Sequence, residues 1–159
     1  MAKTLIAYFS FSNNTKQVAQ MLQEILDADL FRIEQTHTYP DDYNRLIDVA
    51  AQEKRNNDRP ALTQTLDNLD DVDTIFILYP NWWATAPMPV FTFLESYNFN
   101  QKKIYPLCTH EGSGLGTSVA DIKKIAPEAI VNSGLALRGS RVATEKGSLA
   151  KWALQSKSL

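Results

Sequence analysis

A short polar loop follows the first apolar segment of the chain and has the residue types that bind a phosphate group. The segment Thr4–Phe9 is predicted to be a strand, and the side chains after it are hydroxyls and amides: Ser10, Ser12, Asn13, Asn14 and Thr15. An amphipathic segment starts directly after them, so free N–H groups and the positive end of a helix dipole would face an anion. The loop has neither a Gly-Lys-Ser/Thr ending nor a Gly-x-Gly-x-x-Gly pattern, which excludes two nucleotide motifs. A helix N-cap is the alternative interpretation.

Two adjacent tryptophans lie in the loop that follows the third apolar segment, Thr74–Tyr79. This loop reads Pro80, Asn81, Trp82, Trp83, Ala84 and continues to Pro87 and Pro89. Large rings on a loop are costly to expose to water, so the pair either covers the core or holds a flat ligand. The prolines restrict the loop backbone and would present both rings in a fixed pose.

The loop after the fourth apolar segment is rich in glycine. It contains Thr109, His110, Glu111, Gly112, Ser113 and Gly114, and its alternate glycines let the backbone approach a ligand closely. Sharper motifs fail on spacing. A cysteine phosphatase needs Arg six residues after Cys108, where the chain has Gly114, and a serine-hydrolase elbow needs Gly where it has Glu111.

Apolar segments alternate with amphipathic ones along the chain, and this alternation predicts the elements that position the three loops. We expect strands at Thr4–Phe9, Leu30–Glu34, Thr74–Tyr79, Lys103–Thr109 and Ile130–Leu135. Helical spacing of apolar residues predicts helices around Val18–Ile25, Tyr43–Ala50, Met88–Tyr97, Leu115–Ala126 and Ser148–Lys157, whose apolar stripes are assigned to the core. The pattern implies one α/β domain over residues 1–159, a parallel sheet with helices on both faces. Such sheets bind ligands beyond the carboxyl ends of their strands, where the three loops would meet.

The polar loop and the tryptophan loop together resemble the flavodoxin family. Ser10, Ser12, Asn14 and Thr15 fit the family's phosphate loop, and Asn13 stands where the family usually has Gly; Asn is the residue other than Gly that best tolerates positive φ. The tryptophan loop is similar to the Pro-x-Trp-Trp-Gly-x-x-Pro loop of a flavodoxin subfamily, with Ala84 in place of its Gly. The loop from Thr109 to Gly114 is similar to that subfamily's Thr-x-x-Gly-Ser-Gly loop.

The resemblance implies a flavodoxin-like three-layer α/β/α fold, with a five-stranded parallel sheet of order 2-1-3-4-5, and the cofactor FMN. The three loops would supply a neutral phosphate cradle, an aromatic wall and a glycine-rich edge. Trp82 and Trp83 would contact the flavin ring, and backbone groups of residues 81 to 85 would meet its N5 atom. Which tryptophan stacks on the ring stays open. No catalytic residue and no metal ligand is predicted.

The activity that this resemblance implies is transport of single electrons at low potential between redox partner proteins, whose identity the sequence does not give. The alternative is an NAD(P)H-dependent FMN oxidoreductase or quinone reductase on the same fold. Such an enzyme needs open space over the flavin face, which the Trp pair is expected to cover, so we favour the carrier. His110 and Glu111 are interpreted as solvated loop residues; the functional alternative is that His110 couples flavin reduction to pH.

Two further alternatives contain no flavin. A phospho-receiver domain shares the strand order, but it needs paired acids after the first strand and Asp at the end of the third. The chain has Ser10 and Pro80-Asn81 at those places. A binding module with an empty pocket is the other alternative, and the colour of the purified protein distinguishes it from a flavoprotein.

Composition excludes several classes of partner. The chain has 159 residues and a formal net charge of −2, which gives no indication of binding to nucleic acid or to a membrane. Strand-forming residues begin almost at the N-terminus, so we expect no signal peptide. Cys108 is the only cysteine, which rules out an internal disulfide and predicts a reducing, cytoplasmic location.

Overall fold

A computed structural model describes residues 3–157 of the chain. Its strands are β1 (Lys3–Tyr8), β2 (Asp29–Arg32), β3 (Val72–Pro80), β4 (Lys103–His110), β5 (Ile130–Val131) and β6 (Leu135–Arg138). The α-helices are α1 (Asn14–Leu26), α2 (Tyr43–Asn56), α3 (Met88–Ser96), α4 (Ser118–Ile125) and α5 (Lys146–Leu154). Two short 3₁₀ helices, η1 (Gly139–Thr144) and η2 (Gln155–Lys157), flank α5.

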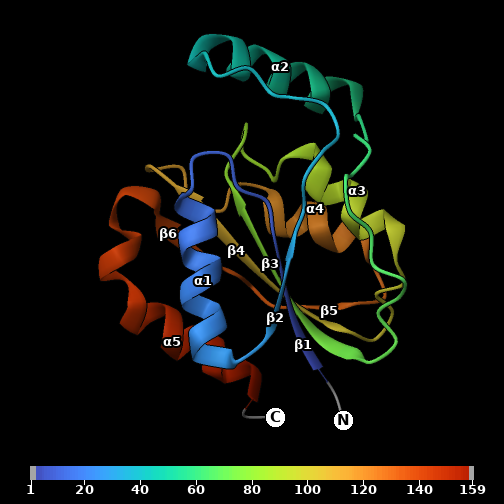
Figure 1. The fold of residues 1–159 in the computed structure, drawn as a ribbon, viewed down its shortest axis with the longest axis vertical. Coiled ribbons are helices and arrows are strands. Elements are labelled where there is room, and N and C mark those ends of the chain that lie inside the picture. Colours follow the sequence, from blue (N-terminus) through green and yellow to red (C-terminus); the bar gives the residue numbers. More distant parts are fainter. Residues whose placement is uncertain (1–2, 158–159) are drawn as a thin grey trace.

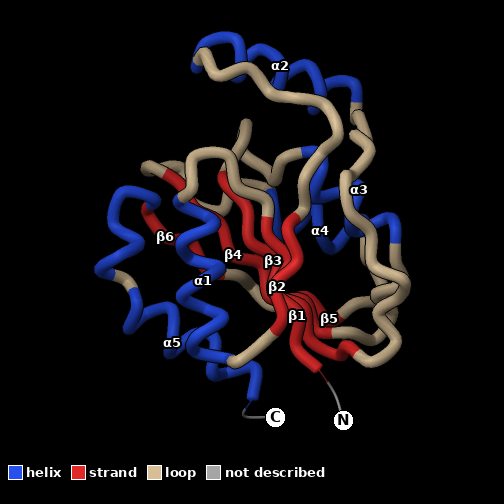
Figure 2. Tube along the Cα trace, viewed as in Figure 1, coloured by secondary structure: helices blue, strands red, loops and turns tan. Residues whose placement is uncertain are grey.

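The strands form one parallel sheet in the order β2-β1-β3-β4-β5, which confirms the predicted topology. In this register Leu5 of β1 lies opposite Ile75 of β3, and Ile75 lies opposite Ile104 of β4. The central strand β3 is apolar nearly throughout because both of its faces are covered. Figures 1 and 2 show β1, β3 and β4 ending at one edge of the sheet, and β1 starting at the opposite edge, near η2.

The last strand position differs from the prediction. Instead of one strand at Ile130–Leu135, two short segments, β5 and β6, each pair with a different part of β4. The residues between them turn: the side chain of Asn132 accepts a hydrogen bond from Gly134 N at 2.9 Å, and Gly134 has a φ of 89°. That backbone conformation favours glycine and breaks a strand.

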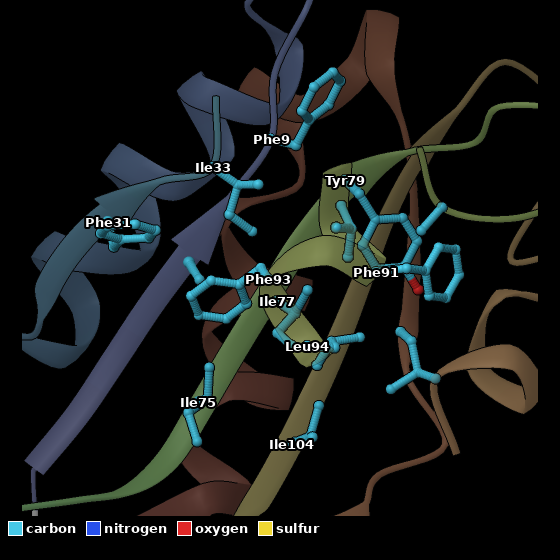
Figure 3. Packing of buried hydrophobic residues seen from close by; sticks show 14 of the residues in the cluster. Phe9, Phe31, Ile33, Ile75, Ile77, Tyr79, Phe91, Phe93, Leu94 and Ile104 are labelled. Carbon is cyan, nitrogen blue, oxygen red and sulfur yellow. The ribbon is translucent and has the colours of Figure 1, made fainter. Parts of the chain in front are cut away.

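Each face of the sheet has its own apolar core. Side chains from alternate positions of β1 and β3, such as Ile6 and Phe76, pack with α1 and α5 on one face. The other set, including Ala7 and Ile77, packs with α3 and α4 on the second face, and Figure 3 shows part of this cluster. Burial of each large apolar side chain contributes about 1.5–3 kcal/mol to folding, so the two cores hold the strand ends in fixed positions.

Two helices differ from the expectation in ways that matter for the strand ends. Leu115 precedes α4, which begins at Ser118, because the residues from Gly112 to Gly116 form a turn with positive φ at each of its glycines. Helix α2 lies beyond the carboxyl ends of the strands instead of along a face of the sheet (Figure 1). In the described residues, no helix has the length and apolar composition needed to cross a membrane.

Candidate functional site

A cavity of about 620 Å³ lies at the carboxyl ends of β1, β3 and β4. This volume is within the roughly 300–1,000 Å³ of typical small-molecule sites. The cavity lies between the three predicted loops and α2. Many of the predicted site residues line it, namely Ser12, Asn14, Pro80, Asn81, Trp82, Trp83, Ala84, Thr109, His110, Glu111 and Ser113.

The remaining predicted residues belong to the same loops but are not among the lining residues from the described part of the chain: Ser10, Asn13, Thr15, Gly112 and Gly114. Two of them have internal roles in the first loop. The hydroxyl of Ser10 accepts a hydrogen bond from Lys16 N at 3.1 Å and so caps the start of α1. Thr15 exchanges a 2.9 Å hydrogen bond with Thr109, which joins the first loop to the end of β4. The loop is therefore both a helix cap and one wall of the cavity.

Asn13 adopts the conformation that its place in the loop predicts. Its φ is 72°, in the left-handed region, directly before the first residue of α1. This turn leaves Ser12 and Asn14 to line the cavity at the helix N-terminus. The backbone N–H groups of a first helical turn have no carbonyl partner within their own helix, and the helix dipole is positive there. Ser12, Asn14 and these amides form the part of the cavity that suits an anion.

The tryptophan loop is a tight turn that its neighbours hold in a strained conformation. Trp82 and Thr85 exchange backbone hydrogen bonds, and the two residues between them, Trp83 and Ala84, both have positive φ, of 57° and 71°. A turn with two positive φ values is normally made by Asn and Gly, and an ordinary side chain there costs about 1–2 kcal/mol per residue. The side chain of Asn81 accepts from Ala84 N and donates to Gly114 O, each at 2.9 Å.

The glycine-rich loop fits closely against this turn. The backbone N–H of Thr117 donates to Ala84 O at 2.6 Å. A Cβ atom added to Gly116 would lie 2.2 Å from the same carbonyl oxygen, so only glycine permits this approach. The two loops are thus joined by Asn81 at one place and by Thr117 at another, and they form one continuous wall.

The two tryptophans have different environments. The ring of Trp82 makes edge contacts with Phe9 at 5.2 Å and with Tyr39 at 5.1 Å, so one side of it belongs to the core. Trp83 is 48% exposed, and its indole N–H donates to Ile47 O of α2 at 2.9 Å. Both interpretations of the tryptophan pair therefore apply to Trp82, which covers core residues and also lines the cavity.

Glu111 and His110 are ordered by local hydrogen bonds. The carboxylate of Glu111 accepts from Ser140 N at 2.6 Å and lies 3.7 Å from the guanidinium of Arg138. Nδ1 of His110 accepts from Gly112 N at 2.8 Å. Glu111 thus binds the β4–α4 loop to the start of η1, and its charge is partly balanced.

Sequence reasoning missed five lining residues. Four of them, Tyr43, Leu46, Ile47 and Ala50, are the apolar stripe of α2 that was assigned to the core, and the fifth is Gly139 of η1. Leu46 does contact core residues, but the stripe as a whole faces the cavity. Periodicity identifies an apolar face without identifying what covers it, so a sequence signal for this role was missing.

The cavity wall is nearly neutral. None of the lining residues from the described part of the chain is Lys or Arg. Below the cavity, burial raises the pKa of the Cys108 thiol to about 12, which keeps it uncharged and unreactive near neutral pH. Burial also raises the pKa of Tyr79, whose hydroxyl donates to Ser118 Oγ at 2.8 Å.

A parallel sheet of this order, with a pocket formed by the loops after β1, β3 and β4, defines a flavodoxin-like protein. The chain belongs to the flavodoxin family, because the family model described as flavodoxin matches residues 3–155. None of the curated proteins compared with the chain is significantly similar to it.

Several solved structures are similar over most of their length. A flavoprotein from Bacteroides eggerthii has 29% identity and a TM-score of 0.85, covering 100% of this chain and 99% of its own. One from Bacteroides uniformis has 28% identity and a TM-score of 0.84, covering 95% and 97%. A flavoprotein in complex with FMN from Lactobacillus acidophilus has 26% identity and a TM-score of 0.72, covering 91% and 98%.

Proposed function

We propose that this protein binds FMN in the cavity at the strand ends. The observation that carries the proposal is the convergence of three loops on one cavity, with an anion-binding helix start at one side and an aromatic, uncharged wall at the other. A flat ring that carries a single phosphate fits that set of groups. The similar flavoprotein from Lactobacillus acidophilus, which was solved with FMN, supports the same ligand.

Ser12, Asn14 and the first amides of α1 would hold the phosphate without an ion pair. A hydrogen bond to a charged group contributes about 1.5–3 kcal/mol, so three or four such bonds give substantial affinity. Because these donors are neutral, no cationic side chain balances the charge of the phosphate, and its affinity depends on the number and direction of the hydrogen bonds. Thr15 and Thr109 would act one step further away, since their mutual bond fixes the loop relative to β4.

Trp82, Trp83 and the backbone from Asn81 to Ala84 would bound the ring. Aromatic contacts add about 0.5–1.5 kcal/mol beyond buried area. Trp82 is supported from behind by Phe9 and Tyr39, so it offers a rigid surface, whereas Trp83 is fixed through its bond to α2.

We propose further that the protein carries electrons between redox partner proteins. Bound FMN supplies a centre that accepts and releases electrons one at a time. The chain contributes a wall without Lys or Arg, which does little to stabilise negative charge on the ring and so favours a low potential.

The first experiment is the absorption spectrum of the purified protein, followed by titration of apoprotein with FMN while flavin fluorescence is recorded. A yellow protein, or stoichiometric quenching on titration, supports the cofactor proposal. Colourless protein that leaves the fluorescence of added FMN unchanged would refute it.

The second experiment separates a carrier from the NAD(P)H-dependent oxidoreductase that is the alternative. Stopped-flow mixing of the FMN-loaded protein with NADH or NADPH should give only slow bleaching of the flavin unless a reductase is added. Fast bleaching by the nucleotide alone would overturn the carrier and establish the enzyme.

A further inference from the structure

The first half of α2 presents apolar side chains to the cavity that no core residue covers. Tyr43 is the first residue of the helix and is 72% exposed, and Ile47 follows one turn later. Both line the cavity, and neither belongs to the two core clusters formed by the described residues. Val49, two positions further along, instead packs against the larger core cluster. The helix therefore has one stripe for the core and another for the cavity.

The start of the helix holds Tyr43 and Ile47 in place. The side chain of Asp42 accepts a hydrogen bond from Arg45 N at 3.1 Å and so caps the first turn. Such a cap fixes where the helix begins, and with it the direction of the residues in the first turn.

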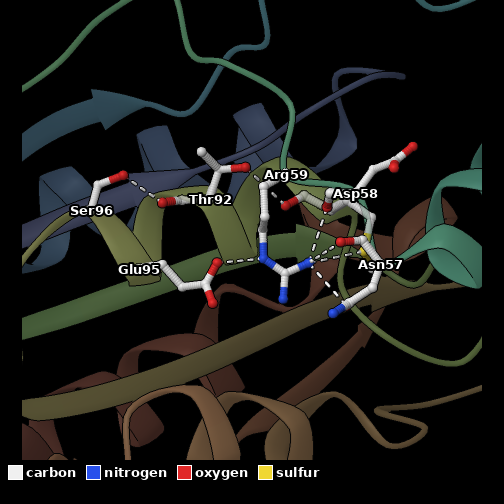
Figure 4. Close-up of polar contacts among 7 residues, drawn as sticks. Asn57, Asp58, Arg59, Thr92, Glu95 and Ser96 are labelled. Carbon is white, nitrogen blue, oxygen red and sulfur yellow. Dashed lines mark hydrogen bonds and ion pairs between the residues drawn. The ribbon is translucent and has the colours of Figure 1, made fainter.

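The second half of α2 is attached to the rest of the protein. The carboxylate of Glu53 accepts from the hydroxyl of Tyr39 at 2.7 Å and lies 3.1 Å from Nε2 of His37. Lys54 Nζ donates to the carbonyl oxygen of Trp83. Just beyond the helix, Arg59 bonds to Glu95 of α3, to Asn57 and to Asp58 (Figure 4).

The tryptophan loop and α2 are therefore opposite walls of one cavity, joined at Trp83. Its indole N–H binds Ile47 O, and its carbonyl oxygen binds Lys54. A ligand that enters between the walls meets the loop on one side and the exposed apolar stripe of α2 on the other. A stripe of Tyr and Ile matches an apolar ring and does not match a phosphate.

We propose that α2 is the second wall of the FMN site, and that Tyr43 and Ile47 are binding residues for the isoalloxazine ring. This inference rests on the proposed binding of FMN. The continuity of the cavity from the phosphate-binding loop to the helix identifies the occupant, because one ligand has to span both regions. The role is specific to the ring, so it applies equally to riboflavin, which has the ring and lacks the phosphate.

The test compares two ligands in the wild type, in two variants of the cavity-facing stripe of α2 and in one control variant. Apoprotein of the wild type, Tyr43→Ala and Ile47→Ser is titrated with FMN and with riboflavin while the quenching of flavin fluorescence is recorded. Each variant should raise the Kd of both ligands by a similar factor, about tenfold, because each removes apolar area that the ring covers. Val49→Ser is the matched control: it alters an apolar residue of the same helix that packs on the core, and it should leave both Kd values unchanged.

A substitution on the phosphate side calibrates the comparison. Ser12→Ala should weaken FMN and leave riboflavin unaffected, the opposite of the pattern expected for α2. Hydrogen exchange adds a readout without substitution, since FMN should slow the exchange of α2 amides in the wild type.

Each outcome has a definite meaning. Unchanged affinities in Tyr43→Ala and Ile47→Ser, with wild-type protein that binds FMN, would overturn the role of α2 and leave the proposed function intact. Loss of affinity for FMN alone would also overturn it, because the residues would then act on the phosphate. A wild-type protein that binds neither ligand would refute the proposed function itself. Tyr43 is largely exposed, so Tyr43→Ala keeps the test valid even where Ile47→Ser does not fold.

Discussion

The two walls of the cavity are built in different ways. The tryptophan loop is joined to its neighbours along its whole length: Asn81 bonds Ala84 and Gly114, and Ala84 bonds Thr117. Helix α2 is attached at Ile47, which Trp83 binds, and through Glu53 and Lys54, while its first turn carries the exposed Tyr43. In the proposed site these walls would have different roles: the rigid wall would fix where the ring lies, and the helix would determine how completely the ring is enclosed.

The largest effect that tests this comparison should come from Trp82. Trp82→Ala removes a ring that supports Phe9 and Tyr39, so we expect the free energy of unfolding of the apoprotein to fall by about 2–3 kcal/mol. Trp83→Ala removes an exposed ring and one hydrogen bond, and should cost about 1 kcal/mol. Both should weaken FMN binding. Urea unfolding measures the difference, and equal losses would show that the two residues do not have separate roles.

A second effect concerns His110, which lines the cavity. Its alternative role, in which it couples flavin reduction to pH, predicts that His110→Gln flattens the pH dependence of the midpoint potential in redox titrations. The chain's other histidine provides the control, because His37 pairs with Glu53 outside the cavity; an unchanged slope in His110→Gln, or an equal change in His37→Gln, would contradict the assignment.

The strain in the rigid wall can be measured directly. Ala84→Gly should raise the free energy of unfolding of the apoprotein by about 1 kcal/mol, because glycine adopts the φ of 71° without a steric cost. Ala61→Gly, at an exposed loop position that is not among those with positive φ, should lower it slightly. A loss of stability in Ala84→Gly would mean that the turn is not strained.

The smallest effect should come from the bond that connects the two walls near the end of the helix. Lys54→Met removes an exposed donor to Trp83 O, so the loss in stability should be less than about 1 kcal/mol. Hydrogen exchange of the amides in α2 should nevertheless become faster. Lys151→Met, on the exposed side of α5, is the control and should leave exchange in α2 as it is. Equal exchange in the two variants would show that Lys54 does not hold the helix.

Much of the fold followed from local patterns. The apolar runs of β1, β3 and β4 identified central strands, and the alternation with helices gave the parallel order that the structure has. The break between β5 and β6 was not predicted, because Ile130 to Leu135 is apolar enough to be read as one strand. Only the turn at Asn132 and Gly134 shows that the sheet position is shared by two segments.

The site was predictable where chemistry is concentrated in loops and not where it depends on packing. Trp82 and Trp83 were predicted because large rings on a loop are costly to expose, and both line the cavity; the predicted loop residue His110 lines it as well. Tyr43 and Ile47 were not predicted, because an apolar stripe is the same pattern whether it faces a core or a cavity. The hydrogen bond between Thr15 and Thr109 was not predicted either, because it joins parts of the chain that are distant in the sequence.

The placement of the two chain ends has a practical consequence. The start of β1 and the helix η2 both lie at the edge of the sheet that is away from the cavity (Figure 1). A linker attached at either end would leave the cavity uncovered. A surface tether made through either end would therefore direct the cavity outward, where added ligands can reach it.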